Sequence, residues 1–341
     1  MKRVLVTGAG SFVGLHCVKL LLEQGYHVRG TLRDSGREAQ LRRTLGKHGV
    51  DDSRLEFVRA DLIDDAGWTR AVDGCPFVLH VASPYPLYPP KDPQAEVIGP
   101  AVEGTLRVLR ACALAGVERV VLTSSTAAIS LGHPPEKTHF DENDWSKVAG
   151  DFGGYGASKT LAERAAWDFV ESQTGGRPVE LVVLHPPFIY GPLLERHYST
   201  SMELVRVLVG RKTPGVARLM VEFSDVRDVA AAHLAALVVP EAAGKRFPIV
   251  GASAWIEEVA MILDEHFAVR GRRIPTRLLP DRLVRFIALF NRSVRLTVPY
   301  LGRQTFTSSD QARRILGWDP RPKEEAIVSL AEGLLEYGLV R

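Results

Sequence analysis

The sequence predicts an α/β fold, with a doubly wound parallel sheet followed by a smaller, mostly helical C-terminal lobe. Two patterns predict it. Short β-branched runs alternate with helical patterns over the first half of the chain, and a glycine-rich turn joins the first strand to the first helix. The composition agrees, because 341 residues of which 45% are hydrophobic can fill the cores of about two domains.

The first half of the chain supplies the strands of the sheet and the helices that cover it. Val13, Cys17, Leu20 and Leu21 form a helical stripe, and Gly25 is a fitting end for that helix. Strands that alternate with helices imply a parallel sheet with right-handed crossovers, as in the Rossmann fold. The expected strands are 3–7, 26–32, 55–59, 77–81, 119–123 and 179–184, and the expected helices are 12–24, 101–115 and 158–172.

The alternation ends after Leu184. Pro186 and Pro187 cannot easily continue a strand, and the sequence beyond them is irregular, with one late strand expected at 247–250. Two helices are expected to close the chain. The first spans 310–316 behind the capping residue Ser309, and the second spans 323–337, with Pro322 near its start.

Charge and composition exclude several classes of protein. A net charge of +3 predicts no bulk attraction to nucleic acid or to a membrane. The three cysteines lie far apart, which argues against disulfides. Neither they nor the ten histidines show metal-ligand spacing, so no metal is expected. No apolar run is long enough for a membrane span or a signal peptide, so a cytoplasmic protein is expected.

An arginine-rich segment lies between Arg270 and Arg303, where nine arginines accompany a single acidic residue, Asp281. One interpretation is a surface for an anion or a partner. The interpretation that we favour is an amphipathic helix whose arginines face water, because an apolar stripe that includes Leu283 and Phe286 runs between them.

The turn after the first strand carries the pattern of a dinucleotide site. Its glycines let the backbone approach a pyrophosphate, and the helix N-terminus offers N–H groups to it. We therefore expect a dinucleotide-binding domain over 1–188 and about 217–250, and a substrate lobe over about 189–216 and 251–341. The residues of the turn expected at the cofactor are Gly8, Gly10, Ser11, Phe12, Val13 and Gly14.

The residues after the second strand indicate which dinucleotide binds. An acidic residue there would favour the ribose hydroxyls of NAD, whereas Arg33, with Arg37 close behind, favours the 2′-phosphate of NADP. We therefore expect NADP (as NADPH) in preference to NAD. Asp61, just past the third strand, is placed to bind the adenine amino group, with a simple helix cap as the alternative for that residue.

A tyrosine, a lysine and a serine supply the chemistry of carbonyl reduction. Tyr155 and Lys159 lie four residues apart on one face of a helix, and Ser125 follows an earlier strand. Hydride addition to a carbonyl leaves an alkoxide that must take up a proton. A free tyrosine has a pKa of about 10, and a nearby ammonium favours its phenolate and lowers that value. The serine hydroxyl polarises the carbonyl.

These motifs and their order resemble the extended short-chain dehydrogenase/reductases. Within that group they resemble the dihydroflavonol 4-reductase-like branch of the NAD(P)-dependent epimerase/dehydratase superfamily. The resemblance covers nearly the whole chain. Besides the glycine turn and the tyrosine motif, it rests on the segments 80–84, 100–106, 121–125, 141–145, 186–192, 223–233 and 316–318.

The resemblance implies an NADP-dependent oxidoreductase that reversibly reduces an aldehyde or ketone to an alcohol. It assigns Ser125 to polarising the carbonyl, Tyr155 to donating the proton, and Lys159 to lowering the tyrosine pKa and binding the ribose. It also implies a small-molecule carbonyl substrate, and homodimers are common in the family. Besides Tyr155 and Lys159, it places further cofactor contacts at Leu62, Val81, Ala82, Ser83, Pro186 and Ile189.

The chain departs from the family pattern, and alternatives stay open. Ser11 stands where the family has glycine, and Ser130 replaces an asparagine that contacts flavonoids, which argues against a flavonoid substrate. The alternatives are a nucleotide-sugar epimerase or dehydratase, a 3β-hydroxysteroid-type dehydrogenase and, outside the enzymes, an NADP-sensing regulatory protein. The substrate pocket is expected from the segments 84–90 and 130–145 and from the chain after Leu193.

Overall fold

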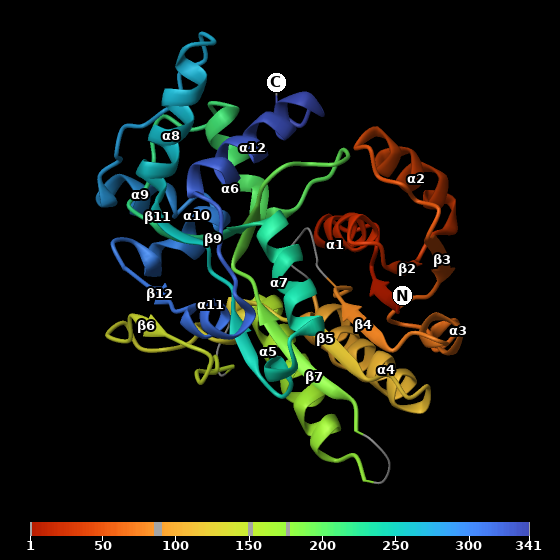
Figure 1. The fold of residues 1–341 in the computed structure, drawn as a ribbon. Coiled ribbons are helices and arrows are strands. Elements are labelled where there is room, and N and C mark those ends of the chain that lie inside the picture. The colour runs from red at the N-terminus through yellow and green to blue at the C-terminus, as the bar shows by residue number, and fades with distance from the viewer. Residues whose placement is uncertain (1, 85–90, 149–152, 175–177, 341) are drawn as a thin grey trace.

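A seven-stranded parallel sheet forms the centre of the protein (Figure 1). The structure, a computed structural model, describes residues 2–84, 91–148, 153–174 and 178–340. The strand order is β10-β7-β5-β4-β1-β2-β3, and every neighbouring pair is parallel, which confirms the predicted doubly wound fold. The strands are β1 (Arg3–Thr7), β2 (His27–Leu32), β3 (Leu55–Arg59), β4 (Phe77–His80), β5 (Arg119–Thr123), β7 (Glu180–His185) and β10 (Arg246–Pro248).

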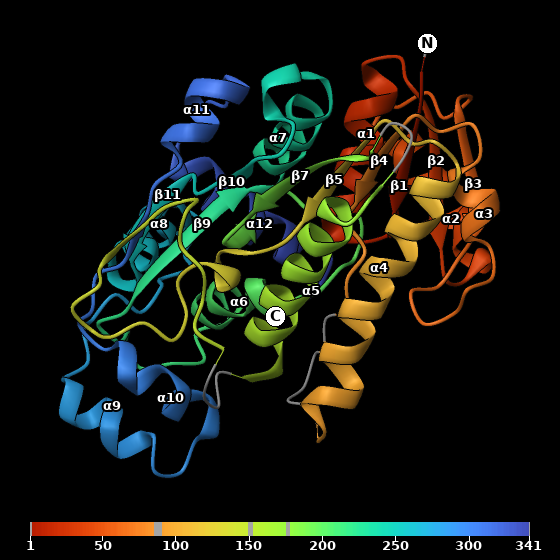
Figure 2. The same cartoon turned by 90° about the horizontal axis from the view of Figure 1, so that it is seen from below.

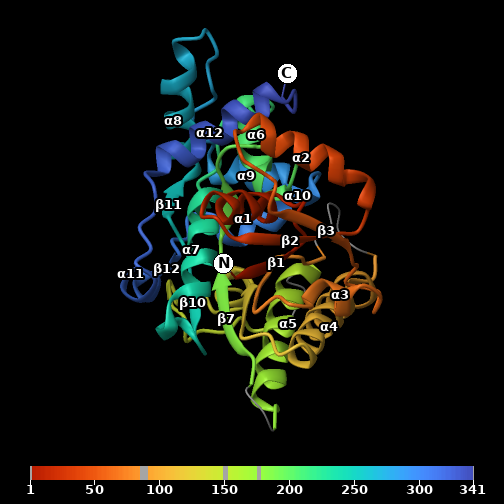
Figure 3. The same ribbon diagram turned by 45° about the vertical axis from the view of Figure 1, so that its right-hand side comes forward.

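Helices cover both faces of this sheet, as Figure 3 shows. One face packs against α1 (Phe12–Glu23) and α7 (Val226–Val238), and the other against α4 (Gly99–Leu114) and α5 (Gly153–Glu171). Successive residues of a strand face opposite sides, so Val4 and Val6 enter the first core and Leu5 enters the second. This double burial explains why the strands are almost wholly apolar. Beside the sheet's far edge lie α2 (Glu38–Lys47) and the short α3 (Trp68–Val72).

The C-terminal half builds a third apolar core outside the main sheet. Its helices include α6 (Glu203–Val209), α8 (Ile256–Ala268) and α12 (Lys323–Glu336), which pack together. Two small sheets belong to this region: β11 (Ala252–Trp255), β9 (Met220–Asp225) and β8 (Phe188–Tyr190) form one, and β12 (Phe306–Thr307) with β6 (His139–Phe140) forms the other. The remaining helices are α9 (Asp281–Ile287), α10 (Arg292–Thr297) and α11 (Asp310–Leu316) (Figure 2). The division into two domains at the boundaries given above stays a prediction.

The structure differs from the sequence expectation at several elements. Helix α5 begins at Gly153 rather than at 158, and α2, α7 and α8 have no counterpart among the predicted elements. Ser309 precedes α11 as predicted, but its side chain makes no cap. Its hydroxyl instead accepts from Val250 N–H at 2.7 Å, because the helix start packs against the end of the main sheet. Among the residues that the structure describes, no helix is long and apolar enough to span a bilayer.

The start of α1 tolerates no side chain at Gly14. A Cβ built there would lie 2.2 Å from the carbonyl oxygen of Gly8, a backbone atom that cannot rotate away. The turn between β1 and α1 therefore depends on glycine at this position, because both the strand end and the helix start are packed into one core.

Gly14→Ala should lower the free energy of unfolding by about 1–3 kcal/mol, since the new methyl group displaces the turn. The measurement is chemical denaturation followed by circular dichroism. Gly46→Ala is the matched control: Gly46 lies inside α2 with open space around it, so alanine there should leave stability unchanged or raise it by up to about 1 kcal/mol. Equal stability of the two variants would contradict the proposed crowding.

Candidate functional site

The glycine turn leaves the start of α1 open to a ligand. Gly8 has a φ of +63°, which favours glycine, and its N–H donates to a threonine hydroxyl of β2 at 3.0 Å. Ser11 is the N-cap of α1 and accepts from Gly14 N–H at 3.1 Å, which gives this departure from the family pattern a structural role. The N–H groups of Phe12 and Val13 have no acceptor within the helix, so they can bind an anion at the positive end of the helix dipole.

The loops after β1 and β4 lie against each other beside this turn. A Cβ at Gly8 would lie 3.1 Å from Cα of Ala82, and Ala82 N–H donates to the Thr7 hydroxyl at 3.0 Å. Val81 is buried in the same loop, and Ser83 is half-buried. The order of the strands reverses between β1 and β4, which is where open α/β sheets bind ligands. Because Gly8 has no side chain and the start of α1 offers N–H donors, the turn after β1 fits a dinucleotide pyrophosphate.

The two arginines behind β2 differ in their partners. Arg33 is exposed directly after the strand. Arg37 donates to Gly10 O at 3.1 Å and forms an ion pair with Glu195, a buried residue that also accepts from Gln40 at 3.1 Å. Glu195 therefore offsets the charge of Arg37, and Arg33 is the better-placed cation for a 2′-phosphate.

Asp61 and Leu62 follow β3 at the same edge of the sheet. The Asp61 carboxylate accepts from Ile63 N–H at 3.3 Å, so it shapes its own turn. Leu62 is held against α4, because a Cβ at Gly104 would lie 2.9 Å from Leu62 Cβ. Both residues are half-buried, and a contact with adenine stays a prediction.

Ser125 lies at the carboxyl end of β5, beside the end of the neighbouring strand β7. Thr126 N–H donates to Pro186 O at 3.1 Å, which joins the two loops. The Ser125 hydroxyl accepts from Ala127 N–H at 3.2 Å and lies 3.4 Å from Pro186 O. Ile189 continues this second loop as part of β8 and packs partly into the first core. The serine and the proline loop therefore hold fixed positions relative to each other.

Tyr155 and Lys159 occupy successive turns of α5. Tyr155 is half-buried and Lys159 is buried, and Lys159 Nζ lies 6.0 Å from the centre of the tyrosine ring. The ammonium donates to Thr123 O at 2.9 Å, at the end of the strand that leads to Ser125. Burial lowers the pKa of Lys159 to about 8, against the opposing effect of Glu163, so the side chain still carries its proton at pH 7.

Glu163 lies one turn beyond Lys159 and is buried with three partners. Its carboxylate accepts from the Ser124 hydroxyl at 2.6 Å, and lies 2.8 Å from His185 Nε2 and 2.6 Å from Arg246 Nε. Burial by itself would raise the pKa of this carboxyl. The interactions with His185, Arg246 and Ser124 outweigh burial and hold the pKa of Glu163 at about 2. Glu163 is therefore ionised at neutral pH.

Arg246 extends this network to the loop predicted to line the substrate pocket. Its Nη1 donates to Glu142 O at 2.5 Å and to Asp144 O at 2.8 Å. Its guanidinium lies 3.8 Å from the centre of the Trp145 ring, a cation–π contact. A single carboxylate, that of Glu163, thereby connects α5 to two strand ends and to this loop.

His80 ends β4 close to the same group of residues. Its Nδ1 lies 2.9 Å from the Thr7 hydroxyl. Burial, with a smaller effect of the Lys159 charge, lowers the pKa of His80 to about 3, so the ring is neutral. Its Nε2 is buried and has no hydrogen-bond partner within the described part of the chain. Such unsatisfied buried atoms are uncommon, and this one lies in the strand that leads to the predicted cofactor segment.

Sequence reasoning missed several residues of this site. Glu163 carried a signal, because it follows Lys159 by four residues and shares its helix face. His185, Arg246 and Glu195 carried none, since they come from distant parts of the chain and no spacing connects them with Tyr155.

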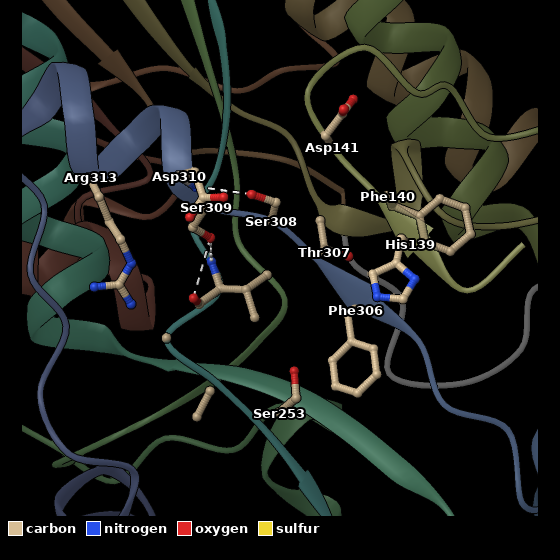
Figure 4. A pocket seen from close by; sticks show the side chains of 13 residues that line it. His139, Phe140, Asp141, Ser253, Phe306, Thr307, Ser308, Ser309, Asp310 and Arg313 are labelled. Carbon is tan, nitrogen blue, oxygen red and sulfur yellow. Dashed lines mark hydrogen bonds between the residues drawn. The ribbon is translucent and has the colours of Figure 1, made fainter.

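A separate cavity of about 450 Å³ lies between the C-terminal half and the segment around β6 (Figure 4). His139, Asp141 and Phe306 line part of it, with the rings of His139 and Phe306 5.5 Å apart, and Ser253 and Arg313 also line it. Neither the serine nor the tyrosine–lysine pair described above lines this cavity. Residues 85–90 of the predicted pocket lie outside the described residues. Over the described ranges, no group of three His, Cys, Asp or Glu side chains could hold a metal ion.

Comparisons with known proteins identify the family and the fold. A model of the NAD-dependent epimerase/dehydratase family matches residues 4–249. Cinnamoyl-CoA reductase CAD2 of Medicago truncatula is 32% identical over 98% of this chain and 95% of its own length. Cinnamoyl-CoA reductase 1 of Petunia hybrida is 39% identical over 71% of each chain.

Solved structures of reductases share the fold over their whole length. The yeast methylglyoxal/isovaleraldehyde reductase Gre2, complexed with NADPH, is 27% identical with a TM-score of 0.82, covering 98% of this chain and 99% of its own. Vestitone reductase from alfalfa is 28% identical with a TM-score of 0.77, covering 100% of both chains.

Glu163→Gln should lower the free energy of unfolding by about 3–5 kcal/mol at pH 7, because it removes the fully buried counter-charge of Arg246, whose side chain is only 11% exposed. The difference from wild type should shrink as the pH falls from about 4.5 towards 2. The folded-state pKa of Glu163 lies below its ordinary value, so its contribution is lost as the carboxylate becomes protonated. Urea denaturation at several pH values measures both effects.

Glu103→Gln is the matched control, because Glu103 pairs with Arg110 at 3.7 Å on the surface. It should change stability by less than about 1 kcal/mol. A Glu163→Gln variant that is no less stable than this control would show that the buried network does not hold the site together.

Proposed function

This chain belongs to the NAD-dependent epimerase/dehydratase family, and from that premise we propose that it is an NADPH-dependent reductase of an aldehyde or ketone, reversible as an alcohol dehydrogenase. Its membership confirms the resemblance found in the sequence, and its named relatives are reductases. The observation that best supports the proposal is the position of Lys159. Its buried ammonium contacts the end of the strand that leads to Ser125 and lies one helical turn from Tyr155.

The residues of the glycine turn fit a bound dinucleotide. The free N–H groups at the start of α1 would hold its pyrophosphate, and Arg33 would bind the 2′-phosphate that distinguishes NADP from NAD. NADPH, when bound, supplies the hydride. Lys159 would bind the nicotinamide ribose, and the loops with Val81 and Pro186 would flank it. All of these loops follow strands at the carboxyl edge of the sheet.

The protein's own part in the reaction is to polarise a carbonyl and deliver a proton. The Ser125 hydroxyl donates a hydrogen bond to the carbonyl oxygen and draws negative charge onto it. The Tyr155 phenol transfers its proton to the developing alkoxide. The Lys159 ammonium stabilises the phenolate that remains, and it can do so at pH 7 because it stays protonated there.

The alternatives are less well supported. Arg33 argues against an epimerase or dehydratase, because those enzymes favour tightly held NAD. A regulatory protein would not need a buried lysine beside a tyrosine. We propose only the class of substrate, an aldehyde or ketone. A 3β-hydroxysteroid-type dehydrogenase is compatible with that class. A homodimer, a cytoplasmic location and the two-domain division stay part of the proposal.

Tyr155→Phe should bind NADPH as wild type does and lose about 10²–10⁴ in kcat, because the substitution removes the hydroxyl that donates the proton and leaves the ring in place. The measurement is NADPH consumption over a panel of aldehydes and ketones, with cofactor affinity taken from NADPH fluorescence. Tyr26→Phe is the control and should keep full activity, since Tyr26 precedes β2 at the opposite edge of the sheet. Near-wild-type turnover by Tyr155→Phe would end the proposed mechanism.

Arg33→Ala should reduce the preference for NADPH over NADH by about tenfold or more, because a charge-assisted hydrogen bond to the 2′-phosphate is lost. The measurement is the ratio of kcat/KM with the two cofactors. Arg43→Ala, an exposed arginine of α2, is the control and should leave the ratio unchanged. An unchanged ratio in Arg33→Ala would place the phosphate site elsewhere.

A further inference from the structure

Helices α9 and α10 expose much of the apolar stripe that runs between the arginines of this segment. Phe290 is 80% exposed, Leu289 64% and Phe286 59%. Among the side chains of α9 and α10 and the turn between them that the structure describes, Val284 and Ala288 are the buried ones. The two helices project from one end of the molecule, away from the main sheet (Figure 2). Arg282, Arg285 and Arg295 face water, as the favoured interpretation of the arginine-rich segment expects, but most of the apolar stripe is exposed beside them.

Five exposed apolar side chains lie on these two packed helices, and we call them the apolar tip: Leu283, Phe286, Leu289, Phe290 and Leu296. The rings of Phe286 and Phe290 lie 5.5 Å apart, and α10, which carries Leu296, packs against α9. Leu114, by contrast, is 91% exposed on α4, a different part of the molecule. Single exposed leucines are ordinary, but connected apolar patches mark surfaces that bind something.

Positive charge surrounds the apolar tip. Arg282, Arg285 and Arg295 are exposed on the same two helices. The one acidic residue of the segment, Asp281, forms its ion pair with Arg218 at 2.7 Å and interacts more weakly with Arg285, so it offsets only part of this charge. The net charge of +3 for the whole chain conceals this local concentration.

Hydrogen bonds fix the tip in its projecting position. Arg295 donates to the carbonyl oxygens of Ala288 at 3.0 Å and Leu289 at 2.9 Å, which ties α10 to the end of α9. The start of α9 is held by Arg218, and Gly302, beyond α10, donates to Arg218 O at 2.8 Å. Both ends of the element are thus attached to one residue of the body, so the apolar side chains cannot simply fold inwards.

We propose that the apolar tip docks on the surface of an anionic lipid bilayer, a property separate from the proposed reductase activity. Phe286 and Phe290 would enter the boundary between headgroups and acyl chains, while Arg282, Arg285 and Arg295 bind lipid phosphates. A second copy of the chain fits less well, because a symmetric contact would bring arginines against arginines. An acidic protein would need a groove matched to a projecting tip, whereas a bilayer needs none.

Vesicle sedimentation tests this proposal. Wild-type protein should bind vesicles of phosphatidylglycerol and phosphatidylcholine at least about tenfold more strongly than vesicles of phosphatidylcholine alone. Binding should weaken when salt is raised from about 100 mM to about 500 mM. Phe286→Ser with Phe290→Ser should lower the partition coefficient about tenfold, and Arg282→Glu with Arg285→Glu should lower it at least as much.

Matched controls separate docking from general surface effects. Leu114→Ser removes an apolar side chain that is even more exposed than Phe286 and Phe290, and Arg43→Glu with Arg314→Glu makes the same charge change elsewhere. Both controls should bind vesicles as wild type does, and all variants should keep their circular dichroism spectra and their NADPH-dependent turnover. Because binding is measured without a substrate, this test stands even if the reductase activity is not found.

Three results would overturn the proposal. The first is no binding to anionic vesicles, and the second is equal loss of binding in the tip variants and their controls. The third is a concentration-dependent dimer in analytical ultracentrifugation that the Phe286→Ser and Phe290→Ser pair abolishes, since the tip would then be covered by a second copy. If the serine pair fails to fold, the arginine pair and its control still decide the question.

Discussion

The buried carboxylate of Glu163 is the contact on which the geometry of the site depends. A desolvated charge is tolerated only when its partners are in place, and here they are a hydroxyl, an imidazole and a guanidinium from three other segments. Ser124 and His185 are each followed by a residue of the proposed site, Ser125 and Pro186. Glu163 itself lies one turn from Lys159. The network of Glu163 therefore positions the groups that would polarise a carbonyl and deliver a proton. Glu163 itself would contact neither the carbonyl nor the proton.

A second constraint is the close approach of backbone at the switch point of the sheet. A Cβ at Gly8 would lie only 3.1 Å from Cα of Ala82, and Ser11 caps the helix that begins there. The ion pair of Arg37 with Glu195 then attaches this turn to the C-terminal half of the chain. With its charge offset by Glu195, Arg37 serves to hold the turn in place.

The apolar tip and the proposed active site illustrate two uses of charge. In the site, charges are buried, paired and few, so their effect is local and specific. On α9 and α10, arginines are exposed and largely without acidic neighbours. Their charges therefore sum to a positive potential over that part of the surface. A chain with a net charge near zero can have both arrangements, because the net charge sums positive and negative groups over the whole chain.

The sequence by itself determined the parallel sheet, the glycine turn and the tyrosine–lysine pair. Those features rest on short spacings: strand runs, a strand-to-helix turn and an i, i+4 pair. Only the tertiary structure decided that Arg246 and Glu195 meet residues far from them in the chain, since no local pattern connects such positions. It also decided that Phe286 and Phe290 stay exposed. An amphipathic pattern shows which side chains share a face of a helix, but what that face meets depends on how the rest of the chain packs around it.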